Sequence, residues 1–270
     1  MNTRHAFDQA IALQARSENL FVGATSDAYQ NMVGPFGGVT AATLLNAVLQ
    51  HPKRIGEPVS LTINFAGPVQ PGAFEIEATP IRTNRSTQHW LLLQRQAGEV
   101  VTSGTAFFAS RRDTWSEQQQ VMPSVVPADG LPPLSRTERS WFGNYDFRYV
   151  SGLFDPASPT ENEADDTETL LWARDAPARP LDFASLTAMG DVFAPRIFHR
   201  RQRFTPAGTV SMTHYYHADA QQLSACDDRH VLGHARAARM HNNYADQIAH
   251  VWSDDGTLLL TSTQVAYYKE

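Results

Sequence analysis

The sequence has a single cysteine, no long apolar run and no excess of basic residues, and each shortage excludes a class of protein. The lone Cys226 cannot form an intramolecular disulfide, which favours a reducing compartment. The first twenty residues mix charged and apolar side chains, unlike a signal peptide. No stretch approaches the roughly 18 consecutive apolar residues that usually span a membrane. We therefore expect a cytoplasmic protein that does not bind or cross a membrane.

Basic side chains are outnumbered, with 22 Lys and Arg against 28 Asp and Glu, which gives a net charge of -6. Proteins that coat nucleic acid or anionic membranes need concentrated positive charge to neutralise phosphates. The charge balance therefore predicts no nucleic-acid partner and favours a small molecule or another protein.

Several catalytic motifs are also missing. No Gly-x-Ser-x-Gly occurs, so the nucleophile elbow of the serine hydrolases has no support. The glycines of 34–38 are followed by neither a phosphate-loop Lys nor a dinucleotide-binding spacing. The pairs His214/His217 and His230/His234 lie in strand-like sequence, where residues three apart face opposite sides and residues four apart are separated by roughly 13 Å. We therefore predict no metal site.

What is present is material for a large core, since 42% of the 270 residues are hydrophobic. An almost uncharged stretch at 39–49 predicts a helix buried on most sides. A strand is expected before it, at 20–25. Runs rich in β-branched and aromatic residues predict four strands after it, at 59–65, 74–83, 89–96 and 100–109. This order suggests a curved antiparallel sheet wrapped around the helix.

The chain also contains an internal repeat. Phe36-Gly-Gly-Val-Thr-Ala resembles Phe183-Ala-Ser-Leu-Thr-Ala 147 residues later, and Val59-Ser-Leu-Thr resembles Val210-Ser-Met-Thr after 151 residues. A third match joins Gly98-Glu-Val-Val-Thr-Ser-Gly-Thr to Gly256-Thr-Leu-Leu-Leu-Thr-Ser-Thr, 158 residues on. The three matches keep their order, and the growing offset is what loop insertions produce. They predict a tandem duplication.

The second half should therefore repeat the plan of the first. We expect strands near 144–150 and 170–174, a helix from Phe183 to about Phe193 with Asp182 as N-cap and Pro195 at its end, and strands from 209 to 268. Polar sequence at 110–139 reads as a linker, and an acidic insertion at 155–169 as a solvated loop. The predicted organisation is an N-terminal domain at 1–112, a linker at 113–139 and a C-terminal domain at 140–270, in a two-layer α+β architecture.

A duplication is an internal control, because polar residues present in only one copy need a reason beyond the fold. At the three offsets, Asp191 corresponds to Leu44, Thr209 to Pro58 and Gln264 to Ala106. A carboxylate in an apolar helix is costly unless it is partnered or functional. The alternatives are structural: Asp191 could pair with Arg196 or Arg200, Gln264 could face outward, and Thr209 could be an ordinary strand residue.

At these positions the sequence resembles the acyl-CoA thioesterases of the thioesterase II type, which have a double hotdog fold. The resemblance spans nearly the whole chain. Its motifs are Phe36-Gly37-Gly38, Met189-Gly-Asp191-Val-Phe-Ala-Pro195, the strand from Gly208 to His217, and Asp255 to Gln264. The departure is that the strand after Thr209 lacks the Asp-His pair of many relatives, which leaves subfamily and chain length open.

The resemblance implies two curved antiparallel sheets, each wrapping a central helix, and hydrolysis of acyl-CoA to free acid and CoA in fatty acid metabolism. It implies no cofactor and no metal, and a homodimer or higher homo-oligomer. Asp191 would be the general base, and Thr209 and Gln264 would orient the water. Backbone N–H groups at Phe36, Gly37 and Gly38 would meet the oxyanion, although tight packing at the helix start explains these glycines equally well.

The substrate would then lie across the molecule. The acyl chain would occupy an apolar channel between the halves, and the phosphates would stay near the surface against Arg82, Arg85, Arg196 or Arg200. A non-catalytic double hotdog protein that binds acyl thioesters is the alternative. A hotdog hydratase or dehydratase would need an Asp and a His close together after a strand, and the sequence offers no convincing pair.

Overall fold

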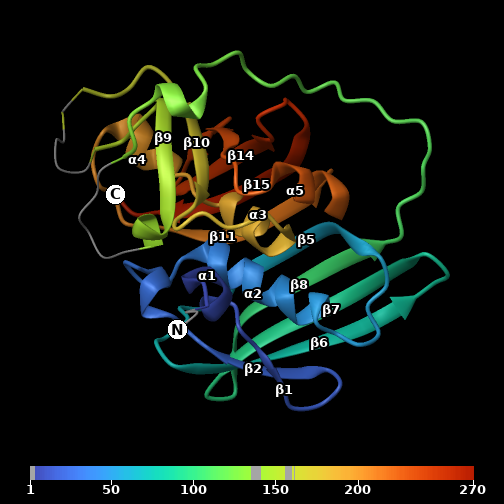
Figure 1. Cartoon of the computed structure of the whole chain (residues 1–270). Helices are drawn as coiled ribbons and strands as arrows, with labels where there is room; N and C mark the ends of the chain where they lie inside the picture. The colour runs from blue at the N-terminus through green and yellow to red at the C-terminus, as the bar shows by residue number, and fades with distance from the viewer. Residues whose placement is uncertain (1–3, 135–140, 156–159, 161) are drawn as a thin grey trace.

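One antiparallel sheet runs through both halves of the chain (Figure 1). The computed structural model describes residues 4–134, 141–155, 160 and 162–270, in which this sheet contains 13 strands. They are β1 (Gln14–Ala15), β2 (Leu20–Ala24), β5 (Glu57–Phe65), β6 (Ala73–Thr83), β7 (Thr87–Gln96), β8 (Glu99–Ala109), β9 (Tyr145–Ser151), β10 (Thr169–Asp175), β11 (Ala207–Tyr216), β12 (Val231–Arg236), β13 (Met240–His241), β14 (Tyr244–Trp252) and β15 (Leu258–Tyr268). The pairing order is β1-β2-β6-β7-β8-β5-β11-β15-β14-β12-β10-β9, and β13 pairs with β14. The expectation of two sheets is therefore corrected, because β5 and β11 pair and join them into one.

The remaining elements are short apart from one helix. The helices are α1 (Ala6–Ala10), α2 (Gly37–Leu49), α3 (Phe183–Met189), α4 (Arg196–Arg201) and α5 (Ala220–Cys226). A two-stranded sheet pairs β3 (Gln30–Asn31) with β4 (Gly34–Pro35), and single 3-10 turns lie at Asp27–Tyr29, Ala128–Gly130 and Trp141–Asn144. Within the described ranges, no helix has the length and apolar character needed to cross a bilayer.

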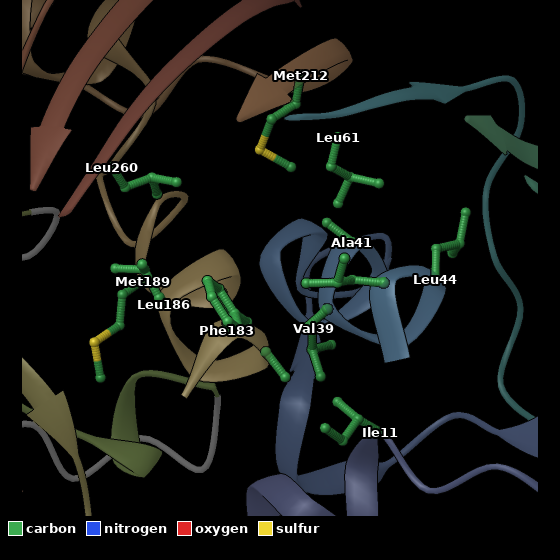
Figure 2. Packing of buried hydrophobic residues seen from close by; sticks show 14 of the residues in the cluster. Ile11, Val39, Ala41, Leu44, Leu61, Phe183, Leu186, Met189, Met212 and Leu260 are labelled. Carbon is green, nitrogen blue, oxygen red and sulfur yellow. The ribbon is translucent and has the colours of Figure 1, made fainter. Parts of the chain in front are cut away.

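Helix α2 is buried on almost every side, as its uncharged sequence predicts. All but three of its 13 residues are buried. It contacts β6 and β7 on one side and α3 on the other, and α3 contacts β10. Figure 2 shows Val39 and Ala41 of α2 close to Phe183 of α3, beneath Leu61 and Met212 from the two central strands. The core is therefore continuous across the two halves.

The second helix region differs from the expectation. Asp182 is the N-cap, because its carboxylate accepts a hydrogen bond from the Ser185 N–H at 2.8 Å. However, α3 ends at Met189, several residues early, with Gly190 as its C-cap. Pro195 does not end this helix but is the N-cap of α4, which the sequence analysis missed. A proline can precede a first helical turn because the N–H that it lacks has no partner there.

Helix α5 was also missed, inside a segment where only strands were expected. Asp219 and Gln222 form a capping box at its start, with the Asp219 carboxylate accepting from the Gln222 N–H. A polar cap three residues before a glutamine is a start signal for a helix. This local signal outweighs the strand pattern on either side.

The internal repeat is visible in the strand register. Thr62 and Thr213, which are 151 residues apart in sequence, pair with each other across β5 and β11, and their hydroxyl oxygens lie 3.0 Å apart. An irregularity between Pro58 and Ser60 in β5 has its counterpart between Thr209 and Ser211 in β11, again 151 residues on. The halves are therefore related by a pseudo-twofold axis that passes close to the two threonines.

The segment after β8 crosses the outside of the C-terminal half as an extended strap, which we define as residues 110–134 (Figure 1). Trp172 donates its indole N–H to the Val126 carbonyl at 2.9 Å, and the Leu258 N–H donates to Gln118 at 2.7 Å. Ala128 packs against Trp172 and Leu232. Residues 135–139 of the predicted linker, and 156–159 and 161 of the acidic insertion, lie outside the described residues. The rest of the insertion is largely irregular and exposed.

Candidate active site

Asp191 lies in the turn that follows α3. Its N–H bonds to the Ala188 carbonyl, and its side chain is 8% exposed. At the corresponding position α2 continues as helix through Leu44 to Leu49. Because α3 stops two residues before Asp191, the carboxylate leaves the helix and is directed toward the start of α2, where Asp191 Oδ2 lies 2.8 Å from the position a Cβ on Gly37 would take.

A chain of side-chain hydrogen bonds joins the three polar residues that the repeat singled out. The Thr209 hydroxyl donates to Gln264 Oε1 at 3.1 Å, and Gln264 Nε2 donates to Asp191 Oδ1 at 2.6 Å. Thr209 sits at the β11 irregularity, and Gln264 is 7% exposed on β15. Thr209 therefore fixes the orientation of the Gln264 amide, which in turn holds the carboxylate.

The structural alternatives for Asp191 and Gln264 do not hold. Arg196 is buried and bonds to the carbonyls of Ala194 and Thr167, while Arg200 pairs with Glu163 at 2.6 Å. Neither arginine is bonded to Asp191, and Gln264 faces inward. Burial also removes Arg196 from the arginines that were candidates for surface phosphate binding.

Burial raises the pKa of Asp191 from 3.8 to about 7, and the hydrogen bonds from Gln264 and from the Gly38 backbone oppose this rise only in part. Desolvation penalises the charged form of a carboxyl group. Because no cationic side chain among the described residues offsets that penalty, the group changes charge near neutral pH. A carboxyl group of this kind can accept a proton from water and give it back.

The first turn of α2 faces this carboxylate. Phe36 is the N-cap residue but makes no side-chain cap, so the first N–H groups of the helix remain open for other acceptors. The Gly38 N–H bonds to Asp191. A Cβ on Gly38 would come within 2.6 Å of the Ala188 carbonyl, so tight packing also applies here. The Phe36 ring stacks on Trp141 at 4.0 Å, which makes it a packing residue beside the site.

Tyr145 of β9 also lies near this cluster and was not predicted from the sequence. Burial and then the neighbouring Tyr29, Asp175 and Asp191 raise its pKa. The repeat could not reveal Tyr145, because β9, the edge strand of the C-terminal half, lies outside the three matched segments.

In each of the two histidine pairs, the two side chains have different neighbours. His214 is buried, whereas His217 bonds to Thr261, and His230 and His234 lie against Asp146 and Glu168 respectively. Over the ranges that the structure describes, no three His, Cys, Asp or Glu side chains gather in a way that could hold a metal ion.

Comparison with known proteins identifies the family. A model of the acyl-CoA thioesterase N-terminal domain matches residues 26–109, and a model of the C-terminal domain matches residues 117–268. No curated protein matches the chain by sequence.

Solved structures agree with this assignment. A conserved hot dog fold protein of unknown function from Alicyclobacillus acidocaldarius is 45% identical, covers 99% of both chains and has a TM-score of 0.94. A putative thioesterase II from Thermobifida fusca is 17% identical over 100% of both chains, with a TM-score of 0.86. The acyl-CoA thioesterase II TesB2 from Mycobacterium marinum is 18% identical over 98% of both chains, with a TM-score of 0.77. With its hotdog fold and both matched domains, the chain belongs to the acyl-CoA thioesterase family.

Proposed function

We propose that this protein hydrolyses acyl-CoA thioesters, with Asp191 as the general base. The observation that carries the proposal is a buried carboxylate with a pKa near 7, held by Gln264 at the open start of a helix and without a cationic partner in the part of the chain that the structure describes. A general base is most effective when its pKa lies near the working pH.

In the proposed mechanism Asp191 removes a proton from a water molecule, and the resulting hydroxide attacks the carbonyl carbon of the thioester. The oxyanion of the tetrahedral intermediate faces the first turn of α2, where the helix dipole and the Gly37 N–H stabilise negative charge. The carbon–sulfur bond then breaks, and the proton held by Asp191 passes to the CoA sulfur. The products are a free acid and CoA.

Thr209 and Gln264 have distinct parts in this mechanism. The Thr209 hydrogen is used in the bond to Gln264, so Thr209 orients the amide and offers its oxygen lone pairs to water. Gln264 holds Asp191 Oδ1 and keeps the carboxylate aimed at the start of α2. The Gly38 N–H is bonded to Asp191, which leaves Gly37 as the oxyanion donor that we favour.

The remaining parts of the proposal concern the fold and the substrate. Each half, at 1–112 and 140–270 on either side of the linker at 113–139, corresponds to one hotdog unit wrapped around α2 or α3. The acyl chain lies in the apolar layer between these helices and the central strands, where Figure 2 shows Leu61 and Met212. The CoA phosphates stay at the surface near the exposed Arg82 and Arg85. We further propose a cytoplasmic homodimer or larger homo-oligomer that acts in fatty acid metabolism.

Thiol release from short, medium, long and aromatic acyl-CoAs tests the proposal. The wild-type protein should hydrolyse at least one class, and Asp191→Asn should abolish that turnover while its circular dichroism spectrum stays unchanged. Full activity of Asp191→Asn would refute the assignment of the base. Saturable binding of acyl-CoA without turnover by the wild-type protein would identify the non-catalytic alternative instead.

A further inference from the structure

Two fully buried polar side chains lie beside the proposed site and have no part in the mechanism. His214 on β11 and Ser262 on β15 are both 0% exposed and stand opposite each other in the sheet. Neither ring nitrogen of His214 nor the Ser262 hydroxyl has a hydrogen-bond partner among the described residues. A buried polar atom without a hydrogen-bond partner destabilises the folded protein, so three of them together indicate that a ligand group binds here.

Their place in the sheet connects them to the catalytic cluster. Gln264 pairs with Met212, two residues along the same two strands. Side chains two residues apart on a strand point to the same face, so Ser262 and Gln264 share one face of β15. The His214 ring lies against Gly190, where a Cβ would come within 2.6 Å of the ring. The two side chains are therefore next to the turn that carries Asp191.

The repeat supplies an independent argument, because the fold does not need polarity here. At the same offsets that relate Thr209 to Pro58 and Gln264 to Ala106, His214 corresponds to Ile63 and Ser262 to Gly104. The N-terminal half forms the same strands with an apolar and a small residue. His214 and Ser262 thus follow the pattern of the proposed catalytic residues, which are polar only in the C-terminal copy.

We propose that His214 and Ser262 form a polar subsite that binds a hydroxyl group on the acyl chain, so that hydroxyacyl-CoA thioesters are the preferred substrates. The inference rests on the proposed function, since it places the thioester carbonyl beside Asp191 and Gln264. Two residues along a strand cover roughly 7 Å. The subsite is therefore within reach of a substituent on one of the first few carbons beyond the carbonyl.

The chemistry of the pair selects a neutral group that both donates and accepts hydrogen bonds. Burial lowers the pKa of His214 to about 3, so the ring is neutral and has one donor nitrogen and one acceptor nitrogen. The Ser262 hydroxyl also donates and accepts. A substrate carboxylate would find no cation here among the residues that the structure describes, and an unsubstituted methylene would leave the polar atoms unpaired. A hydroxyl group satisfies them.

The test compares hydroxylated and unsubstituted acyl-CoAs of equal length, with the hydroxyl placed in turn on carbons two to five. For the best position, the wild-type kcat/KM should exceed that of the unsubstituted substrate by at least about tenfold, which corresponds to one paired hydrogen-bonding group. Ser262→Ala should bring this ratio close to one. His214→Ile, which installs the residue of the other half, should do the same.

Thr102→Ala is the matched control, since Thr102 is also fully buried with an unbonded hydroxyl among the described residues but lies on β8 in the N-terminal half. It should keep the wild-type ratio. Thermal melting shows whether each variant is folded, and Ser262→Ala alone decides the question if His214→Ile does not fold. A wild-type ratio near one at every hydroxyl position, or an unchanged ratio in folded Ser262→Ala, would overturn the subsite.

The outcomes separate this inference from the proposed function. Turnover without a preference for hydroxylated chains refutes the subsite alone. If no acyl-CoA is hydrolysed, the proposed function fails, and the dissociation constants of hydroxylated and unsubstituted acyl-CoA then test the subsite. Tighter binding of the hydroxylated compound that is lost in Ser262→Ala supports it, whereas equal dissociation constants overturn it.

Discussion

The two helices at the centre of the molecule begin in opposite ways. Helix α3 starts with Asp182, which caps the helix through the Ser185 N–H. Helix α2 starts with Phe36, which makes no side-chain cap, and its first turn instead faces the carboxylate of Asp191. The position of Gly37 in α2 is Ala184 in α3. The C-terminal copy thus has a capped helix start, whereas the helix start of the N-terminal copy is open to Asp191 of the C-terminal half.

The strands also differ between the halves, but here the C-terminal half carries the residues of the proposed site. The C-terminal half places Thr209 and Gln264 around Asp191, where the N-terminal half has Pro58 and Ala106. The proposed base and its supports come from one half and the helix start from the other. The duplicated units have thus divided the parts of the proposed site, and the positions that correspond to Asp191 and Gln264 are Leu44 and Ala106 in the N-terminal half.

The largest effect is expected from making the two helix starts alike. In Gly37→Ala the new methyl group would come within 2.8 Å of Asp191 Oδ2 and displace the carboxylate. A displacement of this size can lower kcat/KM by about a hundredfold. Initial-rate assays should show that loss, while Gly67→Ala, where nothing lies within 4 Å, should behave like wild type. Full activity of Gly37→Ala would remove the start of α2 from the site.

Next comes replacing Gln264 with the alanine of the other half. Gln264→Ala removes the hydrogen bond to Asp191, and we expect kcat to fall by about a hundredfold, as when one preorganised donor is removed from an active site. Gln94→Ala removes a buried glutamine from the N-terminal half and should leave kcat within a few-fold of wild type. Equal losses in the two variants would mean that the division between halves is not functional.

Thr209 acts through Gln264, so its replacement should have a smaller effect. Thr209→Val keeps the shape but loses the 3.1 Å bond, and we expect about a tenfold fall in kcat. Thr209→Ser should recover most of the activity. A valine variant as active as the serine variant would show that the hydroxyl group is unnecessary.

The pKa of Asp191 predicts a pH profile that differs between activity and stability. The wild-type kcat/KM should rise with pH and level off above about 7, because the base must be ionised. Stability has the opposite sign: a raised native pKa favours the folded state at low pH, and that contribution is lost as pH rises from about 4 to 7. Asp191→Asn should therefore gain stability over wild type, and gain more at pH 8 than at pH 5, in urea unfolding. An equal difference at the two pH values would contradict the raised pKa.

The smallest effect is expected at the capped helix. Asp182→Ala removes the N-cap of α3 and should lower the free energy of unfolding by about 1 kcal/mol, measured in urea. Activity should change little because this helix start does not face the proposed carboxylate. Asp219→Ala, which removes the cap of α5, is the matched control and should give a similar loss. A large loss of activity in Asp182→Ala alone would give α3 a part in catalysis.

Much of the fold follows from local pattern and from the repeat. Strands β2 and β5 to β8 and helix α2 lie where the strand-like runs and an uncharged stretch predict them, whereas the two-residue strands β1, β3 and β4 were not predicted. The early end of α3 at Met189 could not be read in the same way, because apolar sequence resumes at Val192 and Phe193 directly after Gly190 and Asp191. The pairing of β5 with β11 could not be predicted either, because it depends on how two strands that are distant in sequence meet.

The sequence predicted which residues form the candidate site, but it did not predict the hydrogen bonds between them. Comparing the copies singled out Asp191, Thr209 and Gln264, and the structure brings them together. The sequence could not show that Thr209 bonds to Gln264 or that the Gly38 N–H is bonded to Asp191. These contacts depend on side-chain directions at a strand irregularity and a helix end, which no spacing rule fixes.

The contact between Thr62 and Thr213 has a consequence for how this site could arise. In a dimer of identical half-chains, every change of codon appears in both subunits, so a position could not be glutamine in one and alanine in the other. Fusion of the two copies into one chain removes that restriction. The joined strands β5 and β11 also keep the halves together at any dilution, since their effective concentration is set by the linker. Covalent fusion thus gave each copy the genetic freedom to specialise while the interface between the copies stayed symmetric.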